Sequence, residues 1–340
     1  MNKFAKLLTT AALCFGATAG VAVAETKLTI STWLPPKHSI NTGMFEGLID
    51  MMEEATGGEV TGELKHGLAP PPAQMDLIMD GAADIAIIFH GYQPGRFVGT
   101  KLIELPGYEG NAEAASVAYW RVHEAHLAKL GEHRGVKVIS LNTHGPGQMH
   151  SNAEVTELAQ LNGMKMRIGG GVAGDVGAAL GVKGIRVPGP KVYETLASNA
   201  ADGVAISIES RVGFKLTEVA KNVYQMPGGF YRGSFAVIMS QEAFDALPED
   251  AQKALDEKVF GEPASRMMGK VWDDADAKGV AATQAAEDNA IHVANEADQA
   301  AFAKIAEEVT AKVLAELETA GVDAQAAHDM VKSEMAKSGS

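Results

Sequence analysis

The chain has 340 residues, of which 46% are hydrophobic and 21% charged, and 43 acidic residues against 29 basic ones give a formal net charge of −14. This length and apolar content are enough for a sizeable core and favour two domains over one. An acidic surface repels nucleic acid and anionic lipid, so neither is expected as a partner. A site for an anionic ligand must therefore be a local positive charge, shielded from water inside the protein.

The first 24 residues have the composition of a secretory signal peptide. Lys3 and Lys6 supply positive charge, residues 7–21 are apolar, and Ala22-Val23-Ala24 is a small-x-small cleavage signal. The alternative, a buried N-terminal helix, fits this pattern less well. Cleavage would also remove the only cysteine, Cys14, and would leave 27 basic residues against 43 acidic ones, a net charge of −16. An exported chain without disulfides or thiolate metal sites is expected.

Strands and helices are predicted to alternate through the first half of the mature chain. Helical segments rest on apolar residues three or four positions apart, such as Met44, Leu48 and Met52. The predicted order is strand 27–33, helix 40–55, strand 60–64, helix 73–79, strand 84–89, helix 112–130 and strand 136–142. This alternation is typical of a mostly parallel sheet covered by helices.

A second block repeats the alternation and ends in a helical tail. Its predicted elements are helix 154–161, strand 164–168, helix 172–180, helix 191–198, strand 203–208 and strand 235–239. From Gln241 onward the composition shifts to Ala, Glu, Asp, Lys and Gln, which predicts long helices broken near 261–263 and at Gly321. No further run of eighteen apolar residues follows residue 24, so the mature protein is expected to be soluble, without direct membrane insertion.

Two α/β lobes joined by more than one crossing segment would enclose a cleft. Ligands of open α/β sheets bind beyond the carboxyl ends of the strands, and clefts between lobes are preferred ligand sites. The residues expected at the site therefore follow predicted strands, and they are Trp33, Phe89, His90, Thr143, His144, Arg167 and Ser207.

Residues 169–174 (GGGVAG) fit the GxGxxG pattern between a strand and a helix. A dinucleotide-binding loop is possible in form, but the preceding strand carries Lys165 and Arg167 instead of an apolar run. We favour a loop in which glycines let the backbone approach a ligand held by Arg167, with the following helix N-terminus adding amide donors.

Other motifs predict neither catalysis nor a metal. His144-Gly145-Pro146-Gly147 is similar to an oxyanion-hole loop, yet no GxSxG nucleophile elbow accompanies it. His123 and His126 have a spacing that could bind a metal on a helix, but a solvated helix face is the favoured interpretation. We expect no cofactor and no metal. An exported enzyme using the His144 loop remains the alternative.

Several segments, in order, resemble the substrate-binding proteins of tripartite ATP-independent periplasmic (TRAP) transporters, the DctP-type family. In this chain, TGGEV at 56–60 and GAADIAI at 81–87 match the family's N-terminal pattern. Further along, the family typically has the motifs GLKIR, LG, EVYTALQQG and VDG, in this order. The corresponding segments are 142–152 (NTHGPGQMHSN), 161–171 (LNGMKMRIGGG), Leu180-Gly181, 192–196 (VYETL) and 201–203 (ADG). The resemblance covers essentially the whole mature chain.

The resemblance implies the fold and the role. The fold would be an α/β, two-lobed periplasmic binding protein of the type II-like kind, with mixed sheets, flanking helices and long C-terminal helices. Lobe 1 would hold residues 25–144 plus about 233–262, and lobe 2 residues 145–232 plus about 263–335. The protein would be a periplasmic receptor that closes by a hinge motion around a small organic carboxylate and delivers it to the membrane subunits of a TRAP transporter.

The resemblance also implies ligand contacts. The family's GLKIR arginine, which holds the ligand carboxylate, matches Arg167. Its positions after the first and third strands match Trp33, Phe89 and His90, and its remaining ligand positions match Gly170, Ile206 and Ser207. Further candidates for hydrogen bonds to the ligand are His144, Gln148 and Glu209, and Phe230 with Tyr231 could cap the cleft.

Two departures from the family pattern bear on the ligand. Many relatives carry a second arginine in a GFRQM-like loop, where this chain has Gly147, and Lys191 replaces the acid before VYTAL. With one cleft cation fewer, and with Trp33 and Ile206 present, a monocarboxylate with an apolar or aromatic body is favoured over a dicarboxylate or sialic acid. A binding protein that serves a signalling partner is the remaining alternative.

Overall fold

The first of two β-sheets has the strand order β2-β1-β3-β10-β4. The computed structural model describes residues 25–338, so the predicted signal peptide and Cys14 lie outside the described residues. The strands are β1 (Thr26–Thr32), β2 (Val60–His66), β3 (Ile85–Phe89), β4 (Val136–Thr143) and β10 (Ser234–Ser240). β1 is parallel to β2 and β3, whereas β10 lies between β3 and β4 and is antiparallel to both. The expected mostly parallel sheet is present, with one late strand inserted in the opposite direction.

The second sheet has the order β11-β9-β5-β8-β6-β7. Its strands are β5 (Gly147–Ser151), β6 (Lys165–Arg167), β7 (Lys183–Ile185), β8 (Gly203–Ser207), β9 (Asn222–Gln225) and β11 (Ala290–Val293). β5 is antiparallel to β8 and β9, and the other pairs are parallel. Sequence patterns missed β5, β7, β9 and β11 because these strands have only three to five residues each. β5 is also buried throughout although it contains Gln148, His150 and Ser151, so it lacks an apolar signal.

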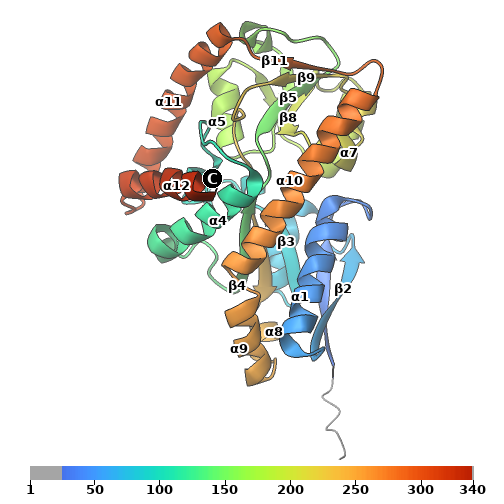
Figure 1. Cartoon of the computed structure of the whole chain (residues 1–340), viewed down its shortest axis with the longest axis vertical. Helices are drawn as coiled ribbons and strands as arrows, with labels where there is room; N and C mark the ends of the chain where they lie inside the picture. Colours follow the sequence, from blue (N-terminus) through green and yellow to red (C-terminus); the bar gives the residue numbers. More distant parts are fainter. Residues whose placement is uncertain (1–24, 339–340) are drawn as a thin grey trace, which may run out of the picture.

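Helices cover both faces of each sheet (Figure 1). In chain order they are α1 (Glu46–Thr56), α2 (Gln74–Met79), α3 (Lys101–Glu104), α4 (Ala112–Val122), α5 (Val172–Ala179), α6 (Val192–Ala197), α7 (Ser210–Gly213), α8 (Gln241–Asp245), α9 (Glu249–Lys258), α10 (Glu262–Ala285), α11 (Glu296–Thr319) and α12 (Ala324–Ser338). A π-helical segment, η1 (Ile40–Phe45), leads into α1, and two more short segments, η4 (His123–Leu127) and η5 (Ala128–Leu130), extend α4. The predicted helices at 40–55 and 112–130 are therefore present, although part of each is not regular α-helix.

The chain passes between the sheets at 144–146, at 226–233 and along α10. Strands from residues 26–143 and 234–240 form the first sheet, and strands from 147–225 and 290–293 form the second. The helical tail contacts both lobes. α10 packs against α4 and β4 and also against α7. α12 packs against α4 of the first lobe, whereas the lobes expected from the sequence placed residues 263–335 in the second. The exact lobe boundaries stay a prediction.

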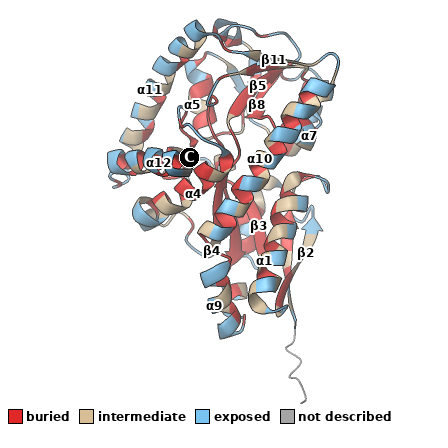
Figure 2. Ribbon diagram, in the orientation of Figure 1, coloured by how far each residue is buried: buried red, intermediate tan, exposed pale blue. Residues whose placement is uncertain are grey.

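The buried residues lie in the sheets and on the inward faces of the helices (Figure 2). β3 and β10 are buried at every position, as expected for strands with helices on both sides. Two apolar clusters form the interior, and each contains residues of both sheets: Ile88 with Ala205 in one, and Ile30 with Val204 in the other. This shared interior holds the two lobes together in a closed arrangement.

The crossing of α10 over α4 depends on a glycine. A Cβ on Gly269 would lie 2.6 Å from Cα of Glu113 and 2.7 Å from the carbonyl oxygen of Ala112. We expect Gly269→Ala to lower the free energy of unfolding by about 1–3 kcal/mol, because overpacking outweighs the better helix propensity of alanine. Gly174→Ala in α5 is the matched control. Its Cβ would have no neighbour nearer than 3.7 Å, so up to about 1 kcal/mol of stabilisation is expected. Urea unfolding followed by circular dichroism measures both, and a stabilising Gly269→Ala would contradict the close crossing.

Candidate ligand-binding site

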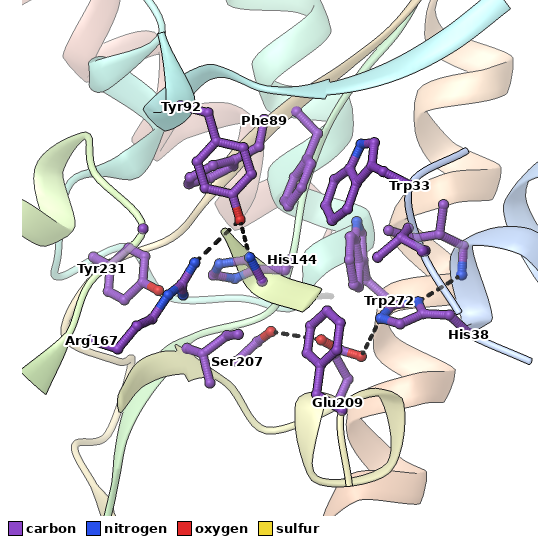
Figure 3. Close-up of a pocket in the computed structure, with 17 residues that line it drawn as sticks. Trp33, His38, Phe89, Tyr92, His144, Arg167, Ser207, Glu209, Tyr231 and Trp272 are labelled. Atoms are coloured by element: carbon purple, nitrogen blue, oxygen red, sulfur yellow. Dashed lines mark hydrogen bonds and ion pairs between the residues drawn. The ribbon is translucent and has the colours of Figure 1, made fainter. Parts of the chain in front are cut away.

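A cavity lies between the two sheets, with an empty space of about 450 Å³ that includes its opening to solvent. Figure 3 shows that side chains from both lobes point into it. The lining residues are Trp33, Leu34, His38, Ile40, Phe89, Tyr92, His144, Arg167, Gly169, Gly189, Ile206, Ser207, Glu209, Phe214, Tyr231, Phe235 and Trp272. Most of these side chains are aromatic or apolar, and the few polar ones lie at the two ends.

The strand ends explain why this cavity forms here. Trp33 and His144 follow β1 and β4, Phe89 ends β3, and Arg167 and Ser207 end β6 and β8. β1, β3 and β4 run in one direction in the first sheet, and β6 and β8 run parallel in the second. The carboxyl ends of both sets of strands therefore meet at the cavity, as in other open α/β sheets.

Arg167 is the positive charge of the cavity, and its side chain is only 2% exposed. Its Nε donates to the carbonyl oxygen of Val187 at 2.8 Å, and its Nη2 donates to Oη of Tyr92 at 3.2 Å. No Asp or Glu within residues 25–338 forms an ion pair with it. A guanidinium held only by neutral acceptors keeps its charge uncompensated, which makes it a strong anion site.

Tyr92 connects Arg167 to the first lobe. Its Oη accepts from the backbone N–H of Gly189 at 2.6 Å as well as from Arg167. With two donors already on the oxygen, the phenol hydrogen remains available to donate to a ligand. Arg167 and Tyr92 together thus offer donors from both lobes at one end of the cavity.

Aromatic rings in mutual contact form the walls. Phe89 contacts Tyr92 with ring centroids 4.7 Å apart and Phe235 with centroids 5.0 Å apart, and Phe235 contacts Trp272 at 5.3 Å. Trp33 lies edge-on to Tyr92, and its Nε1 donates to the carbonyl oxygen of Ile87 at 3.0 Å. Rings fixed by such contacts form a rigid apolar slot that suits a flat apolar group.

Glu209 and His38 lie at the other end, away from Arg167 (Figure 3). Ser210 Oγ donates to Oε1 of Glu209 at 2.6 Å, and Oε2 lies 3.7 Å from Nε2 of His38. Burial raises the pKa of Glu209 to about 8, with the neighbouring Asp276 adding to the effect, and burial lowers the pKa of His38 to about 4. Both shifts favour the uncharged forms of these two side chains near pH 7.

His144 is buried among aromatic rings. Its ring lies edge-on to Tyr231 and Phe235, and its Nδ1 is 2.6 Å from the carbonyl oxygen of Gly145, to which it donates. Burial lowers the pKa of His144 to about 4, so the ring is neutral at pH 7. It lines the cavity as an aromatic edge, and in residues 25–338 no hydroxyl side chain hydrogen-bonds to it.

Eight of the residues expected from the sequence line the cavity: Arg167, Trp33, Phe89, His144, Ile206, Ser207, Glu209 and Tyr231. Five others, among them Thr143, do not line it. His90 points away from the cavity, because its Nδ1 hydrogen-bonds Ser234 Oγ at 3.0 Å and its Nε2 hydrogen-bonds His133 Nε2 at 2.9 Å. Gln148 is occupied by the backbone of Met226, with which it exchanges two hydrogen bonds.

Gly170 and Phe230 also have structural roles. Gly170 has φ +108, and a Cβ there would lie 2.2 Å from the carbonyl oxygen of Gly91, so the glycine permits a close approach between the lobes. Phe230 is 0% exposed and packs against Phe302 at 4.9 Å between ring centroids. Its neighbour Tyr231 lines the cavity in its place.

The glycine loop 169–174 differs from the expectation in one respect. The backbone N–H of Val172, at the start of α5, donates to Oε2 of Glu104 at 2.8 Å. The first amide of this helix is therefore used by the protein's own carboxyl group and does not face a ligand. Of the loop residues, only Gly169 lines the cavity between the sheets.

Several lining residues carried no usable sequence signal. His38, Tyr92 and Phe214 lie in loops or short helical segments, and Phe235 reads as an ordinary strand residue. Trp272 lies within the helical tail and reaches the cavity because α10 packs on β4, where its Nε1 donates to Oδ1 of Asn142 at 3.0 Å. Only the tertiary arrangement brings these residues together.

Two sequence-level expectations concern metals and membranes. Over residues 25–338, no group of three or more His, Cys, Asp or Glu side chains is placed to hold a metal ion, and this includes His123 and His126. Among the helices that the structure describes, none combines the length and apolar character needed to cross a bilayer.

Comparison with known proteins places the chain among bacterial binding proteins. The DctP family model, described as bacterial extracellular solute-binding protein, family 7, matches residues 30–317. A TRAP periplasmic solute-binding protein from Bordetella bronchiseptica with bound (R)- and (S)-mandelate is 32% identical, with a TM-score of 0.88, 92% of this chain covered and 99% of that one. A TRAP solute-binding protein from Rhodoferax ferrireducens in complex with copurified benzoate is 27% identical, with a TM-score of 0.85 and coverages of 92% and 98%. Outer membrane transporter protein TsaT of Comamonas testosteroni is 27% identical over 336 residues, 98% of both chains.

The neutral state of Glu209 has a measurable consequence. Its pKa is about 8 in the folded protein against an ordinary value of 4.5, so the folded chain keeps a proton that the unfolded chain releases. This contribution to stability is complete below the unfolded pKa and is lost as the pH rises through the folded pKa. Glu209→Gln lacks this contribution at every pH. We therefore compare the free energy of unfolding of the variant with that of wild type at each pH. The variant value minus the wild-type value should rise between about pH 5 and about pH 8, by at most about 1.4 kcal/mol per pH unit.

Urea unfolding over this pH range provides the measurement. Histidines away from residue 209 titrate alike in both proteins, so their effects cancel in the difference. A difference that stays constant from about pH 5 to about pH 8 would mean that Glu209 is ionised in the folded protein.

Proposed function

The chain belongs to the bacterial extracellular solute-binding proteins, family 7, and we propose that this TRAP solute receptor binds a monocarboxylate with an aromatic body. One observation carries the proposal: the buried guanidinium of Arg167, without an acidic partner among the described residues, faces a cavity walled by aromatic rings. The ligand carboxylate would lie against Arg167, and its ring would lie between the aromatic side chains. This ligand class agrees with the expectation from the single cleft arginine.

The charge of Arg167 favours an anion of small size. A carboxylate can accept two hydrogen bonds from a guanidinium in a planar arrangement, and burial strengthens the pairing because water does not compete. The hydroxyl of Tyr92, 3.2 Å from Nη2, is placed to donate to the same anion. Ligand binding would thus neutralise a buried charge that the folded chain leaves uncompensated.

The rest of the cavity favours an aromatic group. Phe89, Phe235 and Trp272 present ring faces and edges, and burial of a flat ring among them gains apolar area and edge-to-face contacts. The relatives from B. bronchiseptica and R. ferrireducens hold mandelate and benzoate, which are aromatic monocarboxylates. Their similarity supports the same ligand class here.

Both lobes contribute to the ligand site, which links binding to closure. Arg167 comes from the second sheet, whereas Tyr92 and Phe89 come from the first. A ligand that contacts both lobes binds the closed form more tightly than an open one and therefore shifts the population toward closure. We infer that the closed receptor acts in the periplasm after removal of residues 1–24 and delivers its ligand, unchanged, to TRAP membrane subunits.

The alternatives from the sequence receive less support. An enzyme using the His144 loop would need that ring to activate a nucleophile. The Nδ1 atom instead bonds to the carbonyl oxygen of Gly145, and the ring packs between Tyr231 and Phe235. A binding protein for a signalling partner would have the same ligand site, and membrane-subunit genes beside this one would separate the two roles.

Removal of the guanidinium should abolish the ligand response. We expect Arg167→Ala to weaken binding of benzoate or mandelate by about 100-fold to 3,000-fold, since it deletes one partner of a buried ion pair. In a thermal-shift assay, wild type at about 100 times the dissociation constant gains about 2.7 kcal/mol, and the variant should gain almost nothing. Arg186→Ala removes an exposed arginine outside the cavity and should respond like wild type. An unchanged shift in Arg167→Ala would refute the proposed anion site.

The ligand class can be tested with wild type alone. Isothermal titration calorimetry should show aromatic monocarboxylates binding at least about 100-fold more tightly than succinate. A second carboxylate would be buried without a cation, at a cost of several kcal/mol. Tighter binding of succinate than of benzoate, mandelate and phenylacetate would overturn the proposed class.

A further inference from the structure

The end of the cavity opposite Arg167 has a buried polar atom without a hydrogen-bond partner. Nε2 of His38 is buried and forms no hydrogen bond. Oε2 of Glu209 lies 3.7 Å from it, beyond hydrogen-bond length, while Oε1 receives the hydroxyls of Ser210 at 2.6 Å and Ser207 at 3.4 Å. Buried polar atoms normally have a hydrogen-bond partner, so the unpaired Nε2 of His38 requires an explanation.

The hydrogen bonds around His38 determine its tautomer. The backbone N–H of Ile40 donates to Nδ1 at 3.3 Å, so Nδ1 is the bare nitrogen. Because the ring is neutral at pH 7, Nε2 carries the hydrogen and is an unused donor. The ring itself is held in place by a tilted contact with Phe214, with centroids 5.1 Å apart.

Both atoms lie close to the backbone of Gly213. A Cβ on Gly213 would lie 2.8 Å from Oε2 of Glu209 and 2.8 Å from Nε2 of His38. Any side chain at 213 would therefore displace one or both atoms, so a glycine is needed to keep them in place. His38 and Glu209 also line the ligand cavity, so a ligand in the cavity lies beside both side chains (Figure 3).

The electrostatics of this end favour a neutral polar group. Burial raises the pKa of Glu209, and the carboxyl of Asp276, which accepts from the backbone N–H of Glu209 at 3.0 Å, raises it further. A second ligand carboxylate would be buried here without a cation, whereas an ammonium group would have to draw a proton off Glu209. A hydroxyl, which both donates and accepts, matches an N–H donor beside a carboxyl group.

We propose that His38 and Glu209 form a subsite for a hydroxyl group on the ligand, at the end remote from its carboxylate. The hydroxyl oxygen accepts from Nε2 of His38 and exchanges a hydrogen bond with Oε2 of Glu209, which gives the unpaired Nε2 a partner. This inference rests on the proposed function, since Arg167 must hold the carboxylate for the other end of the ligand to reach His38. The favoured ligands are then hydroxylated aromatic acids.

The subsite would favour hydroxylated ligands, because a ligand without a hydroxyl leaves the N–H of His38 without a hydrogen bond. An acid without the hydroxyl leaves the N–H of His38 buried and unpaired, whereas the hydroxylated acid satisfies it. Sites built to bond a ligand hydroxyl reject the analogue that lacks it far better than apolar sites reject an extra group.

Calorimetric titration of matched acids tests the subsite. The probes are benzoate with 3- and 4-hydroxybenzoate, and phenylacetate with 3- and 4-hydroxyphenylacetate. For wild type, at least one hydroxylated isomer should bind about tenfold or more tightly than its parent acid. In His38→Phe this ratio should fall to about one.

Gly213→Ala is the second variant, because it keeps both polar groups and adds a methyl group that would displace one or both of them. It too should reduce the ratio to about one, and it keeps the test available if His38→Phe does not fold. Arg167→Ala is the control for the opposite end, and it should weaken a parent acid and its hydroxylated isomers alike.

Two results would overturn the subsite while leaving the proposed function intact. In one, wild type binds each parent acid at least as tightly as its hydroxylated isomers. In the other, the preference for a hydroxyl persists in both His38→Phe and Gly213→Ala. If wild type binds none of the aromatic acids but does bind an aliphatic acid, the proposed function and the subsite both fail.

Discussion

The buried guanidinium of Arg167, with no carboxylate partner in the part of the chain that the structure describes, is the feature on which the rest of the site depends. A peptide carbonyl and a phenol hydroxyl hold it in place, at 2.8 and 3.2 Å, without neutralising its charge. The desolvation that makes this charge costly in the free protein makes an anionic ligand favourable, because the ion pair forms away from water. A chain of net charge −14 can therefore still select an anion.

The cavity keeps its charge at one end only. At the other end, burial favours the uncharged forms of both Glu209 and His38, so that a carboxyl and an imidazole act as neutral hydrogen-bonding groups. The aromatic walls between the two ends carry no charge and exclude water. Under the proposed function, this division gives the ligand one orientation, with its carboxylate toward Arg167 and its other end toward His38.

Contacts outside the cavity also hold the lobes together. Glu104, from α3, accepts from the backbone N–H of Val172 at the start of α5, and the backbones at Gly91 and Gly170 approach too closely for any side chain at Gly170. Burial raises the pKa of Glu104 to about 7 even though three hydrogen bonds favour its ionised form. Closure therefore involves polar and backbone contacts between lobes in addition to those made through a ligand.

Sequence alone determined the parts of this protein that depend on local pattern. Apolar spacing located the longer strands and helices, and the strand-end rule with the family resemblance identified Arg167, Trp33 and Phe89, because these positions follow directly from where a strand stops. Tertiary structure decided the rest. The antiparallel insertion of β10, the arrival of Trp272 from the helical tail and the pairing of His38 with Glu209 all join segments far apart in the chain. The packing of whole helices and strands determines which residues are buried and which residues they contact. A short stretch of sequence does not contain this information.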